Sequence, residues 1–329
     1  MQIVIPTLPL PVIGAGVLLW LLARLWRQGG RGWFVGLLAL CAAQSLLIAL
    51  IHHYGLTALA RLQPFSAMLI PPLGWAALLS GAIRPVARRD LLHLVPPLAM
   101  GWALMQGGWA IDALLIVSFT GYGVAILWTL RGGADALPLS RLQGGERAAT
   151  IWRLIGAGLI LSALGEGLIG AAFALGRPEV VGWVIGGYSA GLLLALGVLS
   201  LSRDLTAPPD APEAAPPDPE RDADDAALVE RLRALLARQP LHRDPDLTLA
   251  RLARRLGVPA KPLSAAINRH TGENVSRLIN RLRIDEACGH LRGGSSVTEA
   301  MLQAGFNTKS TFNREFRRIT GQAPSSWRG

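Results

Sequence analysis

The sequence has little charge, little cysteine and almost no lysine. Charged residues make up 16% of its 329 residues, 51% are hydrophobic, and the mean hydropathy is +0.38. This balance excludes an ordinary soluble globular protein and indicates membrane-spanning segments. Cys41 lies in an apolar stretch and Cys288 in a basic one, so we expect neither a disulfide framework nor a zinc site.

Signals for catalysis and for secretion are also missing. No nucleophile and base pair, metal-ligand spacing or phosphate-binding loop stands out in the sequence, so we expect no enzyme activity, no cofactor and no bound metal. The first residues carry no positive charge, and no small-residue cleavage site follows the first apolar run. We therefore expect this run to be retained as a first membrane helix.

The charge that is present is divided unevenly along the chain. Residues 1–202 hold 12 basic and 6 acidic residues, residues 203–225 hold 2 and 8, and residues 226–329 hold 18 and 8. The middle segment is also rich in proline, which disfavours both a helix and a packed core. The sequence predicts a membrane domain at 1–202, an acidic linker at 203–225 and a basic, polyanion-binding domain at 226–329.

Seven apolar stretches in the first 202 residues are about long enough to cross a bilayer as helices. We expect spans at 5–26, 33–52, 62–83, 91–106, 109–130, 151–175 and 180–201. The fourth of these is short and contains Pro96 and Pro97. The predicted fold class is all-α, with a seven-helix transmembrane bundle before the basic domain.

The arginines between these stretches predict how the chain crosses the membrane. Alternate loops carry three arginines each, whereas two of the loops between them carry only Arg61 and Arg177. Basic residues in short loops favour the cytoplasmic side. We therefore expect a bacterial inner-membrane protein with its N-terminus outside and its basic C-terminal domain in the cytoplasm.

Two polar residues within the expected spans, Glu166 and Gln44, are candidates for sensing a signal. A carboxylate in an apolar helix is costly in lipid, so Glu166 should face the bundle interior, a partner or water. Two interpretations stay open for Glu166. It contacts a ligand or a proton, or it is a packing residue beside Gly165 and Gly167.

Short amphipathic helices separated by glycine turns follow residue 225. We expect helices at 226–238, 249–256, 260–270, 275–291, 297–304 and 308–318. The second and third form one helix-turn-helix around Gly257, and the last two form another around Gly305. Such units, joined by the helix at 275–291, would present two recognition helices to successive faces of the DNA major groove.

This segment resembles the DNA-binding domain of the AraC/XylS family. The resemblance covers about 100 residues and is carried by Leu252-Ala253-x-x-Leu256-Gly257-Val258, Leu263-Ser264, Thr271-Gly272, Arg283-Ile284-x-Glu286-Ala287, Gly305-Phe306, Phe312-Asn313-Arg314-x-Phe316, Thr320-Gly321 and Pro324-Ser-Ser-Trp327-Arg328. A multi-span domain followed by this module is similar to membrane-bound members of that family.

The resemblance implies which side chains face the DNA. The base-reading candidates are Lys261, Ser264, Asn268, Lys309, Ser310, Asn313 and Arg314. The candidates for contacts with DNA phosphates are Arg251, Arg254, Arg255, Arg281, Arg317 and Arg318. Lysine and arginine can bond guanine, and asparagine can bond adenine with two hydrogen bonds, so the second recognition helix carries more base readers.

The sequence predicts a membrane-embedded, one-component transcriptional regulator, which we expect to act as an activator. Its expected partners are double-stranded DNA, the lipid bilayer and RNA polymerase, while a small-molecule or membrane signal and a homodimer are left open. Two alternatives also stay open. The first is a transporter or membrane enzyme with a regulatory C-terminal module, and the second is a tethered DNA binder that senses nothing.

Overall fold

The computed structural model describes residues 9–27, 32–108, 110–177, 179–184, 187 and 219–327. Within these ranges the chain is helical, with connecting turns and no β-strand; one isolated antiparallel bridge joins Arg141 and Thr248. The expectation of an all-α chain is confirmed for this part of the protein.

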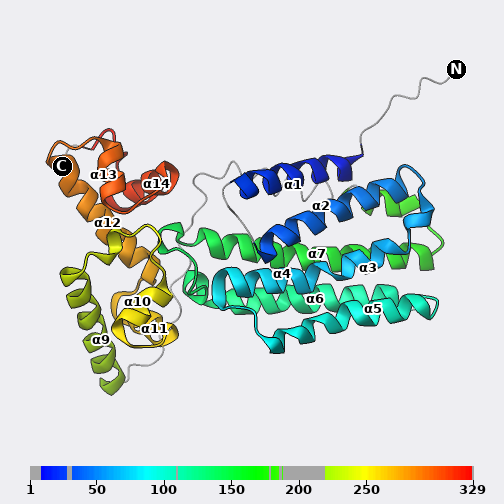
Figure 1. Ribbon diagram of the computed structural model, residues 1–329, viewed down its shortest axis with the longest axis horizontal. Helices are drawn as coiled ribbons and strands as arrows, with labels where there is room; N and C mark the ends of the chain where they lie inside the picture. The colour runs from blue at the N-terminus through cyan, green and yellow to red at the C-terminus, as the bar shows by residue number, and fades with distance from the viewer. Residues whose placement is uncertain are drawn as a thin grey trace. The chain divides into compact units, whose positions relative to one another are not determined.

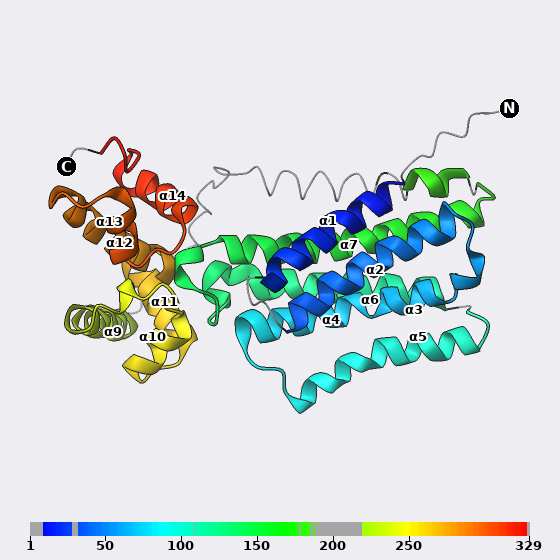
Figure 2. The ribbon, with the colours of Figure 1, turned by 45° about the horizontal axis from the view of Figure 1, so that its top comes forward.

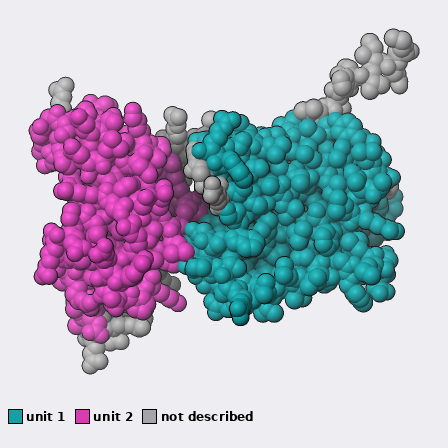
Figure 3. Space-filling model, viewed as in Figure 1, with its two compact units in different colours: residues 1–129, 152–201 teal, residues 130–151, 202–329 magenta. Residues whose placement is uncertain are grey.

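The chain divides into two compact units, coloured separately in Figure 3. Unit 1 comprises residues 1–129 and 152–201. Unit 2 comprises residues 202–329 together with residues 130–151. A segment that sequence analysis treated as a simple loop between two spans therefore belongs to the same unit as the C-terminal helices.

The helices of unit 1 are long, apolar and packed side by side (Figures 1 and 2). They are α1 (Leu10–Arg27), α2 (Trp33–His52), α3 (Leu62–Met68), α4 (Ile70–Leu78), α5 (Val95–Met105), α6 (Ile111–Thr129) and α7 (Arg147–Ala174), the last of which begins in unit 2. Large apolar side chains are exposed on them, including Val117 at 71% and Phe173 at 62%. Exposed apolar surface of this kind is typical of sites that contact a membrane or another protein.

Five helical stretches are long and apolar enough to cross a membrane. They are Leu10–Arg27, Trp33–His52, Leu62–Ile83, Ile111–Ala136 and Arg147–Ala174, where the third joins α3 and α4. The expected fourth span is instead the 11-residue α5, preceded by a 3₁₀ segment that holds Asp90 in an ion pair with Arg84. The expected seventh span, 180–201, lies largely outside the described residues, so a count of seven is not established.

Helices α6 and α7 approach each other closely at two glycines. A Cβ atom at Gly123 would lie 2.7 Å from the Gly156 carbonyl oxygen, and one at Gly156 would lie 3.2 Å from the Gly123 carbonyl oxygen. Small residues permit this backbone contact between apolar helices. The contact fixes the relative positions of the two helices that flank the 130–146 segment.

Within the described residues 219–327, unit 2 contains six α-helices, labelled α9 to α14 in Figure 1. They are α9 (Pro219–Arg238), α10 (Leu249–Leu256), α11 (Ala260–Thr271), α12 (Val275–Arg292), α13 (Val297–Gln303) and α14 (Lys309–Thr320). The pairs α10 with α11 and α13 with α14 form the two expected helix-turn-helix units, joined by α12. Their observed ends lie within two residues of the expected ones.

The first of these helices differs from its expected range. Helix α9 begins at Pro219, seven residues before the expected start at 226, so the expected linker overlaps the helix. Asp225 is buried and accepts two hydrogen bonds from the Arg269 guanidinium group, at 2.6 and 2.9 Å. Through this ion pair, the end of the acidic, proline-rich stretch is attached to α11.

Each helix-turn-helix has its own apolar core and its own glycine turn. The first core gathers leucines and isoleucines of α9 to α12, and the second packs Phe306, Phe312 and Phe316 against α12. Gly305 has a φ of +86°, and a Cβ atom there would lie 2.5 Å from the Arg243 carbonyl oxygen. The second turn therefore requires glycine for two reasons: the backbone has a positive φ there, and no room is left for a Cβ atom.

Arg283 of α12 is fully buried between the two cores. Its Nε donates to the His242 carbonyl oxygen at 2.6 Å and its Nη2 to that of Asp244 at 2.8 Å. The guanidinium carbon also lies 5.5 Å from the centre of the Phe306 ring. Burial lowers the pKa of Arg283 to about 10, so the group remains a cation at neutral pH.

The carbonyl groups that receive these bonds are themselves held in place. Glu286, one turn after Arg283 on α12, pairs with the His242 ring at 2.7 Å and with Arg243. Burial raises the pKa of Glu286, but the hydrogen bonds from Arg243 and His242 outweigh it and leave the pKa below its ordinary value. The Glu286 carboxylate is therefore ionised at neutral pH and fixes the 242–243 segment.

We predict that Arg283→Met loosens the second helix-turn-helix. The buried carbonyl groups of His242 and Asp244 would lose their charged donor, at a cost of about 3 kcal/mol. Hydrogen–deuterium exchange of the full chain in lipid nanodiscs should then show α13 and α14 exchanging about a hundredfold faster. Arg238→Met removes an exposed arginine as the control, and equal exchange in the two variants would contradict the role given to Arg283.

Candidate nucleic-acid interface

The first recognition helix, α11, follows Gly257, which has a φ of +71° and ends α10. Lys261 is exposed near its start, and Ser264 and Asn268 are partly buried. Ser264 already has a partner, since its hydroxyl group donates to the Asp135 Oδ2 atom at 2.7 Å. Of the three base-reading candidates on α11, Lys261 is the most accessible.

The second recognition helix, α14, presents more of its candidates to the surface. Lys309, Ser310 and Asn313 are exposed. Arg314 differs from them because its side chain is only 12% exposed and pairs with Glu315 at 3.0 Å. The sequence predicts more base-reading side chains on α14 than on α11. In the structure, the candidates of α14 that are exposed are its first three.

The candidates for phosphate contacts fall into two groups. Three of them form ion pairs inside unit 2: Arg251 with Asp244, Arg281 with Glu273, and Arg318 with Glu315. The other three, Arg254, Arg255 and Arg317, are exposed and have no ion pair within the described residues. The second group is therefore free to neutralise a polyanion.

Sequence analysis did not predict that residues 130–151 pack with the C-terminal helices of unit 2. Leu142 is buried in the first core of unit 2, beside leucines of α9 and α10. Its N–H group donates to the Leu247 carbonyl oxygen at 2.9 Å, and the Ala250 N–H group donates to that of Pro138 at 3.0 Å. The segment is therefore part of the hydrophobic core of this unit.

Polar contacts attach the same segment to the helices that carry the DNA candidates. The Asn274 amide donates to Glu146 at 2.6 Å, and the Ser276 hydroxyl group donates to the Leu142 carbonyl oxygen. Gln143 is buried and accepts from the N–H group of Asn307, in the second turn, at 3.4 Å. Together with the Asp135 bond to Ser264, these contacts link the segment to α11, α12 and the turn before α14.

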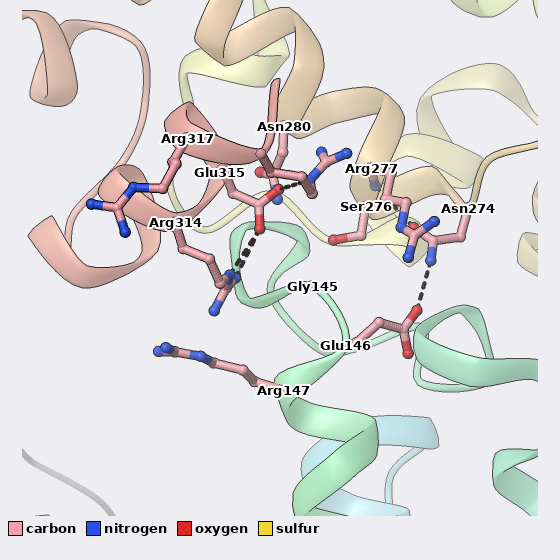
Figure 4. Close-up of a pocket in the computed structure, with 11 residues that line it drawn as sticks. Gly145, Glu146, Arg147, Asn274, Ser276, Arg277, Asn280, Arg314, Glu315 and Arg317 are labelled. Atoms are coloured by element: carbon pink, nitrogen blue, oxygen red, sulfur yellow. Dashed lines mark hydrogen bonds and ion pairs between the residues drawn. The ribbon is translucent and has the colours of Figure 1, made fainter. Parts of the chain in front are cut away.

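A cavity of about 390 Å³ lies between this segment, α12 and α14 (Figure 4). It is lined by Gly145, Glu146, Arg147, Asn274, Ser276, Arg277, Asn280, Arg314, Glu315, Arg317 and Arg318. Figure 4 shows the guanidinium groups of Arg147 and Arg314 on one side and the Glu146 carboxylate on the other. Three of the DNA candidates therefore also face a cavity.

The two sensor candidates lie on different helices of unit 1. Gln44 of α2 is buried, its amide oxygen accepts from the Ser66 hydroxyl group at 2.6 Å, and its amide nitrogen donates to the Gln63 carbonyl oxygen at 3.3 Å. Glu166 of α7 is partly buried and close enough to Asp112 of α6 for their charges to interact. Gln44 is thus occupied by helix packing, whereas Glu166 lies near a second acidic group.

The C-terminal part of the chain matches a known domain family. Residues 252–329 match the model of a helix-turn-helix domain. The chain is 32% identical over 98 residues to the HTH-type transcriptional activator RhaS of Pectobacterium carotovorum, and 35% identical over 78 residues to RhaS of Pectobacterium atrosepticum. It is also 32% identical over 90 residues to an uncharacterized HTH-type transcriptional regulator of Staphylococcus aureus.

These matches cover only part of each protein. They include 30%, 23% and 27% of this chain and 35%, 28% and 12% of the respective relatives. No solved structure matches the chain significantly. The comparisons therefore establish an AraC-type helix-turn-helix domain at the C-terminus and do not extend to residues 1–202.

We predict that Leu142→Ala weakens the first helix-turn-helix. Truncating a buried leucine creates a cavity and costs about 2 to 5 kcal/mol. Hydrogen–deuterium exchange should therefore accelerate in α10 as well as in the 130–151 segment. Leu139→Ala, in the same segment but at an exposed residue, is the matched control. If α10 kept its protection in Leu142→Ala, the segment would not be part of this core.

Proposed function

We propose that the protein is a membrane-embedded transcriptional regulator. Residues 1–202 carry its membrane helices, residues 203–218 are a tether, and residues 219–329 form its DNA-binding domain, to which residues 130–151 contribute. A signal at the membrane domain alters how the DNA-binding domain engages duplex DNA. The observation that carries this proposal is the inclusion of residues 130–151, which connect two apolar helices, in the unit that holds both helix-turn-helix motifs.

The match to a helix-turn-helix family and the excess of positive charge in residues 226–329 support DNA binding. Lys309, Ser310 and Asn313 lie exposed on one recognition helix and Lys261 on the other, as reading of base edges requires. Exposed arginines beside them supply contacts with phosphates. The relatives that share the domain are called transcriptional activators, and activation of transcription would make RNA polymerase a further partner.

Support for the membrane comes from the five long apolar helices and their exposed apolar side chains. The exposed large residues of unit 1 include leucine, valine, phenylalanine and tryptophan on several helices. In water these surfaces would cause aggregation, and in a bilayer they contact lipid. The arginine-rich loops support a cytoplasmic DNA-binding domain, because basic residues in short loops favour that side of a membrane.

The 130–151 segment offers a route by which a signal could reach the DNA-binding domain. Helices α6 and α7, which flank it in sequence, meet at Gly123 and Gly156, so a shift between them moves the ends of the segment. The segment holds Ser264 of the first recognition helix through the Asp135 carboxylate. Because Ser264 is already bound to Asp135 it is not available to DNA, and we infer that the bound segment lowers DNA affinity.

We place the signal near Glu166. The Asp112 carboxylate lies 3.6 Å from where a Cβ atom of Gly170, one turn after Glu166, would be, and acidic groups within apolar helices respond to a proton, a cation or a polar ligand. A reporter for the regulated gene should respond less to its signal in Glu166→Gln than in the unmodified protein. Gln44→Ala, which removes a residue occupied by packing, is the comparison. An unchanged response in Glu166→Gln would remove Glu166 from the proposal.

The two classes of DNA contact predict different binding defects. Asn313→Ala should lower affinity for the cognate duplex by about 1 to 3 kcal/mol and relax sequence preference at one position. Arg254→Ala should weaken all duplexes alike and reduce the slope of affinity against salt by about 1. Fluorescence anisotropy with cognate and scrambled duplexes at several salt concentrations measures both. A uniform loss for Asn313→Ala would show that it does not read bases.

The coupling proposal predicts that releasing Ser264 strengthens DNA binding. In the full chain in nanodiscs, Asp135→Ala should raise cognate affinity about fivefold or more, and Asp135→Asn, which keeps the hydrogen-bond acceptor, should raise it less. Asp224→Ala removes an exposed acidic residue outside the segment and controls for net charge. Unchanged or weaker DNA binding by Asp135→Ala, with normal protection of α11, would contradict the inhibitory role.

A further inference from the structure

The cavity between the 130–151 segment, α12 and α14 has an unusual excess of positive charge. Five arginines and two glutamates line it. Both oxygens of one of these glutamates, Glu315, are occupied, because Arg314 pairs with Oε1 and Arg318 with Oε2. The remaining guanidinium groups, those of Arg147, Arg277 and Arg317, have no ion pair within the described residues.

Two buried atoms on the cavity walls also have no hydrogen-bond partner. They are the Arg314 Nη1 atom, a donor, and the Glu146 Oε2 atom, an acceptor. Buried polar atoms are normally hydrogen-bonded, and leaving one unpaired costs free energy. The walls therefore hold a guanidinium group and a carboxylate whose hydrogen-bonding capacity is not filled within the described residues, and these groups favour a ligand with an acidic group and a hydrogen-bond donor.

We propose that this cavity binds a small phosphorylated molecule that carries hydroxyl or amino groups. Arginine is suited to phosphate because its planar guanidinium group donates two parallel hydrogen bonds. The phosphate lies beside the guanidinium groups of Arg147 and Arg314, which Figure 4 shows on one side of the cavity, and a hydroxyl or amino group of the ligand donates to Glu146 on the other side. The volume of about 390 Å³ is in the range of ligand pockets and suits a sugar phosphate or a nucleotide.

A phosphate of duplex DNA fits this cavity less well. Asn280 and Ser276, on its α12 wall, are 1% and 2% exposed, and the Arg314 side chain is 12% exposed. These groups lie below the surface, so a duplex backbone, with sugars on both sides of each phosphate, contacts the more exposed arginines first. The cavity also takes one wall from residues 145–147, so an occupied cavity would connect the 130–151 segment to α12 and α14.

Calorimetric titration of the full chain in nanodiscs of uncharged lipid, at constant ionic strength, tests this proposal. The probes are inorganic pyrophosphate and glucose 6-phosphate, with glucose as the uncharged comparison. We expect both phosphates to bind and glucose not to bind. Arg147→Gln should weaken pyrophosphate about tenfold or more and Arg147→Lys less, while Arg238→Gln, which removes an arginine outside the cavity, should leave binding unchanged. Glu146→Gln should weaken glucose 6-phosphate more than pyrophosphate.

Three outcomes would overturn the proposal. The first is the absence of binding by either phosphate at millimolar concentration. The second is an equal loss in Arg147→Gln and Arg238→Gln, which would show general attraction to a basic surface. The third is weaker DNA binding by Arg147→Gln with a smaller salt slope and no effect on pyrophosphate, which would assign the cavity to DNA phosphate. Unchanged exchange protection of α12 and α14 shows that the Arg147 variants are folded.

Discussion

Arg283 is buried in the middle of α12, where the cores of the two helix-turn-helix units meet. Its guanidinium group reaches the carbonyl groups of residues 242 and 244 on one side and the Phe306 ring on the other. A buried cation needs all of these partners, because its desolvation is otherwise uncompensated. This requirement fixes the 241–244 turn, the long helix and the second glycine turn relative to one another, and so sets the spacing of the two recognition helices.

The 130–151 segment depends on that rigid arrangement. It contacts α10 through Leu142, α11 through Asp135, α12 through Glu146 and the second turn through Gln143. One short segment can contact all four places only if they keep constant distances from each other. Through this segment the first recognition helix has an intramolecular partner, and Arg314 of α14, whose side chain is only 12% exposed, faces a cavity.

A single chemical property, the positive charge of arginine, serves three purposes in this chain. Buried in Arg283, it holds the fold together. On exposed helix faces, as in Arg254 and Arg255, it is available for DNA phosphates. Around the cavity, the arginines outnumber the carboxylates, so their positive charge is not balanced. The role of each arginine depends on its burial and on the groups around it. The residue type alone does not reveal either of these.

The local pattern of the sequence determined the helices of unit 2, because apolar spacing and glycine turns act over a few residues. The helices α10 to α14 lie where the spacing predicts them, and apolar length likewise predicted the five long helices of unit 1. The tertiary structure decided the rest. Only the packed structure shows that Leu142 belongs to a core formed by residues 229–279, that Asp225 is buried in an ion pair with Arg269, and that Ser264 and Arg314 face other residues of the chain. Those contacts join segments that are far apart in the sequence. A local sequence pattern does not predict which distant segment will complete a core.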